Sequence, residues 1–258
     1  MLNNKPPSLP PFPYPLKPNH QTWYNKSHMN SAFFVIDGTD GSGKATQSKM
    51  LVERLKTEGY EVETFSFPQY GQKSAGSTEE YLAGHYGSGD EVGPYRGSVF
   101  YAVDRYDASF KIRKALEEGK VVVSDRYVGS NLGHQGGKIS DPAERLKFFK
   151  WNDDFEHNFF GIPRPNVNIV LHVPTEVAQK LADSSAKNGI AHDIHEVDFQ
   201  HLKNAENAYL DIVKIFDHFK LIECMDGDRY QSVQEIHEKV WQIVQQHLKP
   251  INSQNQTI

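Results

Sequence analysis

A glycine-rich loop is the stretch of this chain most able to do chemistry. It reads Gly38-Thr39-Asp40-Gly41-Ser42-Gly43-Lys44, and it follows an apolar, β-prone run at 32–37. A helix-forming segment from 45 to about 58 comes next. This strand, loop and helix order is typical of a loop whose backbone N–H groups, lysine and helix N-terminus hold phosphate. A glycine-rich surface turn would explain the glycines but not their flanks. The sequence therefore predicts binding of a nucleoside triphosphate.

A second polar cluster, Asp125-Arg126-Tyr127, closes an apolar run at 121–123. A carboxylate at this place can hold Mg²⁺ through water, and the arginine offers a planar, charged fork to phosphate. The alternative is an Asp–Arg pair that caps the following helix. A phosphate loop on a neighbouring strand favours the phosphate-binding interpretation.

A third set lies on a predicted long helix, where Tyr101 and Arg105 are one turn apart and point the same way. An aromatic face beside a guanidinium is a platform suited to a nucleobase. Taken alone, the pair would be interpreted as an aromatic core residue and a surface arginine. The segment 129–135 adds amide and imidazole groups that can read the edge of a pyrimidine.

The elements that position these groups alternate along the chain. Strands are predicted at 32–37, 62–67, 121–123, 167–173 and 221–224, and helices at 45–58, 79–85, 95–118, 141–158, 196–218 and 233–248. This alternation predicts an α/β fold with a doubly wound, mostly five-stranded parallel sheet. Ligands of such sheets lie outside the carboxyl ends of the strands. The glycine-rich loop and the Asp125-Arg126-Tyr127 cluster both occur at such strand ends.

Composition limits the setting of the protein. The 28 basic and 33 acidic residues give a net charge of −5, which disfavours nucleic acid as a partner. Cys224 is the only cysteine, so an internal disulfide and a cysteine metal cage are excluded, and we expect a cytoplasmic location. The sequence contains no apolar run of about 18 residues, so no membrane association is predicted.

The two ends of the chain differ from the rest. Residues 1–28 hold seven of the 14 prolines and no acidic residue, which predicts a disordered arm. Residues 251–258 are predicted to form a disordered polar tail. A single domain is expected over 29–250, with a mobile lid at approximately 175–192.

The motifs together resemble the thymidylate (dTMP) kinases, a family of P-loop nucleoside monophosphate kinases. The matching segments are 37–47, Phe67-Pro-Gln-Tyr-Gly71, Phe100-Tyr-Ala-Val-Asp-Arg105, Asp125-Arg-Tyr-Val-Gly-Ser-Asn131, Gly161-Ile-Pro-Arg-Pro165 and Asp193-Ile-His-Glu196. The resemblance covers roughly 32–245. It implies transfer of the γ-phosphoryl group of ATP to dTMP, giving dTDP and ADP with Mg²⁺, a step of dTTP biosynthesis. It also implies a homodimer.

On the ATP side, the resemblance implies that the loop and the start of its helix hold the phosphates. This set is Gly38, Thr39, Gly41, Ser42, Gly43, Lys44, Ala45 and Thr46. Lys44, Asp40, Asp125 and Arg126 are expected to be catalytic. Magnesium would be held by Asp40, Asp125 and Thr46, largely through water.

For dTMP, the resemblance implies that Phe67 would form one wall of the base pocket and that Tyr101 would stack on thymine. Arg105 and Asn131 would form hydrogen bonds with the edge of the base. Asp40 would bind the sugar or the metal, and Arg126 would clamp the phosphoryl groups. His134 falls where the family places an aromatic residue near the sugar 2′ carbon. Tyr70, Gln135 and His195 complete the expected set of dTMP-binding residues.

Three positions depart from the family pattern. Ala45 stands where the motif has Ser or Thr on Mg²⁺, and Gln69 stands where relatives carry arginine. The lid region lacks arginine altogether, since none occurs between Arg164 and Arg229. We expect Lys187 to supply the missing cation, as a point charge without the bidentate fork, so a slow enzyme is predicted.

Other interpretations stay open on the sequence. His192, Asp193, His195 and Glu196 suggest zinc, but the spacing fits no metalloprotease motif, and an approach of His195 to the nucleotide is favoured. The acceptor could be another pyrimidine monophosphate such as dUMP or UMP. A nucleotide-binding protein with weakened catalysis is the third reading, supported by Ala45 and the arginine-free lid.

Overall fold

Five parallel strands form the central sheet, in the order β2-β3-β1-β4-β5. The computed structural model describes residues 31–186 and 199–249. The strands are β1 Ala32–Gly38, β2 Val62–Ser66, β3 Val121–Asp125, β4 Val167–His172 and β5 Phe219–Glu223, and β6 Met225–Asp226 pairs with β7 Arg229–Tyr230 in a separate antiparallel hairpin. The predicted five-stranded parallel sheet is confirmed.

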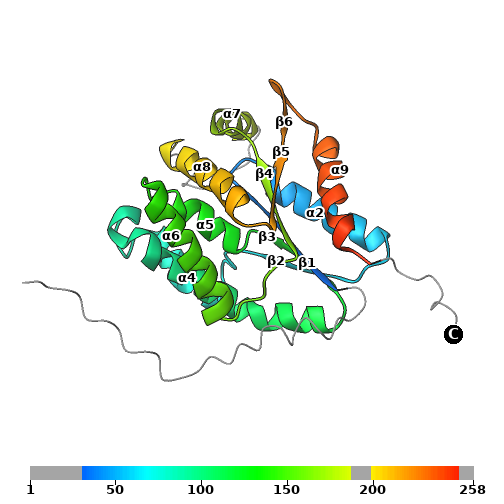
Figure 1. The fold of residues 1–258 in the computed structure, drawn as a ribbon, viewed down its shortest axis with the longest axis horizontal. Coiled ribbons are helices and arrows are strands. Elements are labelled where there is room, and N and C mark those ends of the chain that lie inside the picture. The colour runs from blue at the N-terminus through cyan, green and yellow to red at the C-terminus, as the bar shows by residue number, and fades with distance from the viewer. Residues whose placement is uncertain (1–30, 187–198, 250–258) are drawn as a thin grey trace, which may run out of the picture.

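Helices cover both faces of this sheet (Figure 1). They are α2 Lys44–Thr57, η1 Lys73–Ala75, α3 Gly76–Leu82, α4 Gly89–Glu117, α5 Val128–Gly136, α6 Pro142–Asp153, the π-helix η2 Asp154–Phe159, α7 Thr175–Ala186, α8 Phe199–Ile215, α9 Val233–Val244 and η4 Gln245–His247. α2 and α9 lie on one side, and α4, α5, α6 and α8 lie on the other.

Strand β1 is the centre of the core because all seven of its residues are buried. Its alternating side chains feed two apolar clusters, as expected of a parallel strand covered on both faces. Phe33 and Val35 pack under α4, α5 and α8. Phe34 and Ile36 pack under α2 and α9. The two layers fix the end of β1 that leads into the glycine-rich loop.

The long helix α4 begins earlier than the predicted residue 95. Ser88 and Glu91 form a capping box that starts it, and the backbone breaks helical geometry at Gly93, one residue before Pro94. The short helix predicted at 79–85 lies at Gly76–Leu82. The helix predicted over 141–158 ends at Asp153, and its last residues form the π-helix η2.

Two α-helices, the short 3₁₀ helix η1 and the small hairpin were not predicted. α5 is rich in glycine, and its Gly129, Gly133 and Gly136 lie so close to other residues that an added Cβ would stand 2.4–2.5 Å from their side chains. Helix propensity penalises these glycines, whereas the close packing requires them. α7 occupies the first part of the predicted lid.

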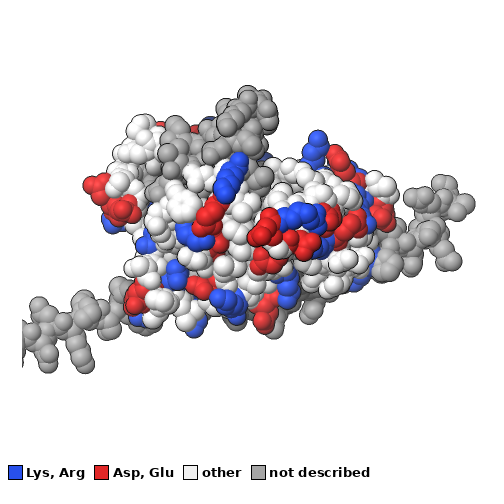
Figure 2. All heavy atoms as spheres, turned by 90° about the horizontal axis from the view of Figure 1, so that it is seen from above, with Lys and Arg blue, Asp and Glu red and all other residues white. Residues whose placement is uncertain are grey.

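Several predictions fall outside the described residues: the arm at 1–28, the tail at 251–258, the second part of the lid, Lys187 and His195. Within the described part, no helix is both long and apolar enough to cross a bilayer. On the face seen in Figure 2, acidic and basic side chains of the described residues are interspersed.

Candidate active site

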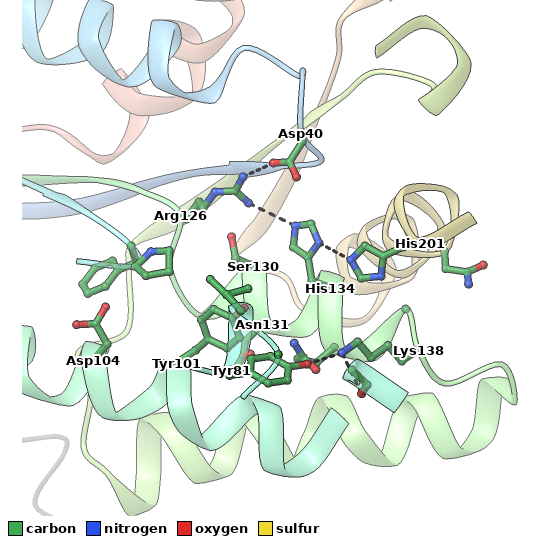
Figure 3. Close-up of a pocket in the computed structure, with 18 of the residues that line it drawn as sticks. Asp40, Tyr81, Tyr101, Asp104, Arg126, Ser130, Asn131, His134, Lys138 and His201 are labelled. Carbon is green, nitrogen blue, oxygen red and sulfur yellow. Dashed lines mark hydrogen bonds and ion pairs between the residues drawn. The ribbon is translucent and has the colours of Figure 1, made fainter. Parts of the chain in front are cut away.

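A cleft of about 1000 Å³ opens at the carboxyl ends of β1, β2 and β3, beside α4, α5 and α8. Its lining includes nine residues that the sequence assigned to dTMP: Asp40, Phe67, Tyr70, Tyr101, Arg105, Arg126, Asn131, His134 and Gln135. Figure 3 shows the polar groups gathered around this cleft. The strand-end rule thus brings together residues such as Asp40 and Arg126, which are 86 positions apart in the sequence.

The glycine-rich loop has the backbone that close approach to phosphate requires. Gly38, Gly41 and Gly43 all have positive φ angles, of 138°, 76° and 88°. A Cβ on Gly38 would stand 2.5 Å from the carbonyl oxygen of Leu171, so only glycine fits there. The side chain of Ser42 is buried, and its hydroxyl has no partner among the described residues. The loop leads directly into α2, whose first residue is Lys44.

Two cations meet on Asp40 at the mouth of this loop. Arg126 Nη2 donates to Asp40 Oδ1, and Lys44 Nζ lies 3.5 Å from the same oxygen. Lys44 Nζ also donates to the carbonyl oxygen of Thr39 at 2.7 Å. Burial would raise the pKa of Asp40, but Arg126 and Lys44 outweigh it and hold this pKa far below its usual range. Burial and Arg126 lower the pKa of Lys44 to about 8, against the opposing effect of Asp40.

Arg126 itself sits in a strained backbone conformation. Its φ angle is 64°, the only positive φ of a non-glycine residue in the described ranges. Its N–H donates to Ile36 O at 2.9 Å, and its carbonyl accepts from Ser124 Oγ at 2.7 Å. Such strain persists where surrounding contacts enforce it, and it is typical of functional sites. β1 and β3 therefore aim the guanidinium at Asp40.

Magnesium ligands are available only in part. Asp125 Oδ1 is buried without a hydrogen-bond partner among the described residues, and burial raises the pKa of this carboxyl. Ala45 and Thr46 are exposed on the first turn of α2. No group of three or more acidic, histidine or cysteine side chains within the described residues could hold a metal. An ion bound mainly by Asp125, substrate phosphates and water fits this donor set, because Mg²⁺ keeps several waters.

His134 connects the phosphate end of the cleft to α8. Its Nε2 lies 3.3 Å from Arg126 Nη1, and its ring stacks on His201 with centroids 5.6 Å apart. Burial is the main cause that lowers the pKa of His134 to about 3. His134 is therefore neutral at physiological pH and adds no charge beside Arg126.

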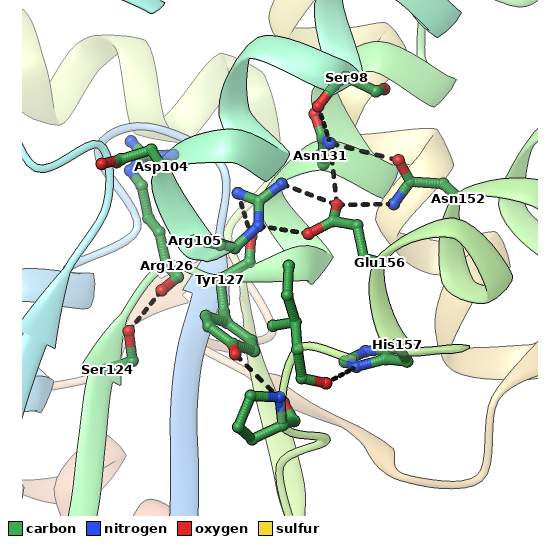
Figure 4. A network of polar contacts seen from close by, with 12 residues as sticks. Ser98, Asp104, Arg105, Ser124, Arg126, Tyr127, Asn131, Asn152, Glu156 and His157 are labelled. Atoms are coloured by element: carbon green, nitrogen blue, oxygen red, sulfur yellow. Dashed lines mark hydrogen bonds and ion pairs between the residues drawn. The ribbon is translucent and has the colours of Figure 1, made fainter. Parts of the chain in front are cut away.

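Arg105 lies at the other end of the cleft and is buried. Taken alone, the Tyr101–Arg105 pair would have been interpreted as including a surface arginine, and that interpretation is wrong. Only 2% of the Arg105 side chain is exposed. Two hydrogen bonds of 2.6 and 2.7 Å join its guanidinium to Glu156 (Figure 4). Burial opposes the charge, but Glu156 outweighs it and raises the pKa of Arg105. Tyr101 lies one turn before Arg105 and also lines the cleft.

Asp104 fastens the loop after β2. It accepts hydrogen bonds from the Gln69 backbone at 2.8 Å, from Gln69 Nε2 at 3.0 Å and from Ser74 Oγ at 2.7 Å. These contacts place Phe67 and the largely exposed Tyr70 on the cleft wall. Gln69 is thus engaged with Asp104, which explains how the loop is ordered without an arginine at this position.

Sequence reasoning missed several residues of this site. Those lining the cleft include Tyr81, Asp104, Ser130, Lys138, Gln200, His201 and Asn204, and Glu156 stands behind it. Asp104 could have been found, since it lies inside the 100–105 motif. Glu156 carries no local signal, because its partner Arg105 is 51 positions away.

Comparisons with known proteins agree on one family. The family model described as thymidylate kinase matches residues 36–240. A thymidylate kinase of Mycobacterium tuberculosis is 30% identical over 182 residues, covering 69% of this chain and 84% of that protein. A probable thymidylate kinase of Pyrococcus abyssi is 28% identical, covering 85% and 98%. The structure of thymidylate kinase from Candida albicans, 17% identical, superposes with a TM-score of 0.62 and covers 84% and 92% of the two chains.

Proposed function

This chain belongs to the thymidylate kinase family, and we propose that its cleft holds dTMP with the phosphate toward Asp40 and the base toward Tyr101. The reaction is phosphorylation of dTMP by ATP, the activity for which the family is named. The relatives favour this acceptor over other pyrimidine monophosphates and over a protein without catalysis. The main support for placing the phosphate at this end of the cleft is that Lys44 and Arg126 both contact one carboxylate oxygen of Asp40.

We assign the ATP phosphates to the loop and its helix start, from Gly38 to Thr46. The positive φ angles of its glycines suit a loop whose backbone N–H groups face a phosphate, and the start of α2 adds its positive dipole end. The orphaned hydroxyl of Ser42 is a further donor toward phosphate. Lys44 and Arg126 neutralise the oxygens between donor and acceptor, which is the main task of catalysis in phosphoryl transfer.

Asp125 is the residue that we propose as the protein's contribution to magnesium binding, with Asp40 beside it. When bound, Mg²⁺ would neutralise charge on the phosphates. The partnerless Oδ1 of Asp125 supports this role. Thr46 is exposed on the first turn of α2, so any contribution from it runs through water. We also propose that Lys187 approaches the phosphates and that His195 approaches the acceptor, although both lie outside the described residues.

The base and sugar are assigned to the other walls of the cleft. Tyr101 and Phe67 would flank the base, and Arg105 and Asn131 would contact its edge. His134, neutral and packed on His201, would stand at the sugar and exclude a 2′-hydroxyl. Tyr70 and Gln135 complete the lining.

We further propose that two copies of the chain pair through an aromatic strip on α4 and η2. This strip consists of Val103, Tyr106, Phe110 and Phe159, each more than 40% exposed. The three α4 residues recur at helical spacing on one side, and the Tyr106 ring contacts Phe110 and Phe160. Apolar surface of this kind is typical of protein interfaces. A cytoplasmic location stays our proposal, supported by the buried free thiol of Cys224.

The direct test of the activity is ADP release from Mg-ATP with a panel of dTMP, dUMP, UMP, CMP and AMP. We expect dTMP to give the highest kcat/KM and dUMP to exceed UMP. A different preferred acceptor would overturn the dTMP assignment. Nucleotide binding without turnover would instead point to a protein that has lost catalysis.

A further inference from the structure

The carboxylate of Glu156 stands behind the wall that Arg105 and Asn131 form at one end of the cleft (Figure 4). Its Oε2 accepts from Arg105 Nε at 2.6 Å, and its Oε1 accepts from Arg105 Nη2 at 2.7 Å. Oε1 also accepts from Asn131 Nδ2 at 3.0 Å and from Asn152 Nδ2 at 3.1 Å. All four side chains are buried. One carboxylate therefore holds both wall residues at once.

This network fixes the orientation of the Asn131 amide. Its Nδ2 faces three acceptors: Glu156 Oε1, Ser98 O at 3.1 Å and Asn152 Oδ1 at 3.2 Å. A flipped amide would set Oδ1 against these oxygens, with no hydrogen between them. The opposite end of the amide, Oδ1, is buried and has no partner among the described residues. Asn131 is therefore a cleft-lining residue that carries an acceptor with no hydrogen-bond partner among the described residues.

The same carboxylate keeps Arg105 as a donor beside that acceptor. The guanidinium donates one N–H to each Glu156 oxygen and one to the carbonyl oxygen of Tyr127 at 3.3 Å. A guanidinium carries five N–H groups, so these three contacts leave two of them unused in a residue that lines the cleft. Arg105 and Asn131 thus offer a donor and an acceptor whose polarity Glu156 enforces.

We propose that Glu156 is a positioning residue that sets the base selectivity of this enzyme, by fixing a donor at Arg105 and an acceptor at Asn131. This inference rests on the proposed function. Thymine and uracil carry an acceptor at O4 next to a donor at N3–H, which complements this pair. Cytosine carries an amino donor at C4 next to an acceptor at N3, and both of its groups are mismatched. Unpaired buried polar groups are what make such discrimination strong.

The π-helix η2 places Glu156 for this task. The wide turn begins at Asp154, between Asn152 and Glu156, and Phe160 N donates to Phe155 O in the i→i+5 pattern. The carbonyl of Glu156 accepts from Ile162 N at 3.0 Å, which secures the backbone. π-Helical turns often occur at functional sites because the extra residue re-aims a side chain.

The test compares kcat/KM for dTMP and dCMP at saturating Mg-ATP in the wild type and in Glu156→Gln. Glutamine keeps the size but turns one acceptor into a donor, so Arg105 or Asn131 must lose its fixed orientation. We expect the dTMP/dCMP ratio to fall by about tenfold or more, mainly through KM for dTMP, with KM for ATP nearly unchanged. Asp153→Asn is the matched control, because Asp153 makes an equally bidentate pair with Arg164 instead.

Parallel losses for both substrates, or an unchanged ratio in Glu156→Gln, would overturn the inference and leave Glu156 a purely structural role. Glu156→Asp keeps the buried charge opposite Arg105, and we expect its ratio to lie between those of the wild type and Glu156→Gln. If the glutamine variant does not fold, Glu156→Asp replaces it in the test. A dTMP/dCMP ratio in Glu156→Asp equal to that of the wild type would then overturn the inference. A wild type that does not phosphorylate dTMP would overturn the proposed function alone, and calorimetric titration with dTMP and dCMP would still measure the selectivity ratio.

Discussion

Lys44 and Arg126 bind the same atom, Oδ1 of Asp40, although they come from different strand–helix units. Lys44 starts the helix after β1, and Arg126 follows β3. β1 and β3 are neighbours in register, with Ile36 opposite Asp125, so the two loops leave the sheet side by side. An anion that replaces or joins Asp40 at this point meets two cations at once. This relationship is the geometric basis of the proposed phosphoryl transfer.

Removing the guanidinium should therefore damage catalysis more than binding of the base. We expect Arg126→Ala to lower kcat by about a hundredfold or more, because phosphoryl transfer depends on neutralising charge. Arg126→Lys should recover part of this loss, since it keeps the charge but not the planar fork. Arg145→Ala, which breaks an ion pair with Asp211, serves as the control in the same steady-state assay. Equal kcat values for Arg126→Ala and the wild type would contradict the assignment.

Binding of ATP should weaken above pH 8. The pKa of Lys44 is lowered to about 8 in the free protein, and bound phosphate must raise it. Below this value the lysine is already charged; above it, binding requires uptake of a proton, so affinity falls by up to about tenfold per pH unit. Calorimetric titration near pH 8.5 in buffers of different ionisation enthalpy measures that uptake. Lys44→Arg cannot titrate there and should show none; the absence of uptake in the wild type would refute the role of Lys44.

The lid should depend on one lysine. We expect Lys187→Ala to reduce turnover by about tenfold or more, because no arginine is present in that segment to share the charge. Lys180→Ala is the matched control, since Lys180 is exposed on α7. Single-turnover rates of the two variants decide the question. An unchanged single-turnover rate in Lys187→Ala would contradict the proposal that Lys187 supplies this charge.

The aromatic strip predicts the assembly state. Phe110 is 57% exposed, and a charge at this position of the strip should prevent two apolar faces from meeting. We expect Phe110→Glu to sediment as a monomer and the wild type as a dimer in analytical ultracentrifugation. Val233→Glu adds the same charge at an exposed apolar residue on α9 and should leave the dimer intact. A monomeric wild type would disprove the pairing.

Local motifs made most of the site predictable. Asp40, Arg126 and Tyr101 each stand in a short pattern tied to a strand end or a helix face, and parallel strands bring such patterns together without further information. Arg105 was predicted as a site residue, but its burial was not, because it depends on Glu156, 51 positions away on a π-helix. Patterns of three or four residues do not encode pairings at that distance.

The fold, like the site, was predictable where a local pattern determines the structure. Its prediction failed where contacts between distant residues determine the structure. The apolar run at 121–123 indicates a buried strand whatever lies around it, and β3 was found. α5 was missed because its glycines argue against a helix, while tertiary packing against Tyr209 and Phe149 requires them. The Ser88–Glu91 capping box was a local signal for the start of α4 that the hydrophobic pattern alone did not reveal.

The most direct test of the central claim is a crystal structure with a bisubstrate analogue that joins adenosine and thymidine through a polyphosphate chain. We expect a single polyphosphate within hydrogen-bond distance of both Lys44 Nζ and the Arg126 guanidinium, with the thymine ring against Tyr101. A thymidine bound outside this cleft, or a polyphosphate that contacts only one of the two cations, would contradict the account.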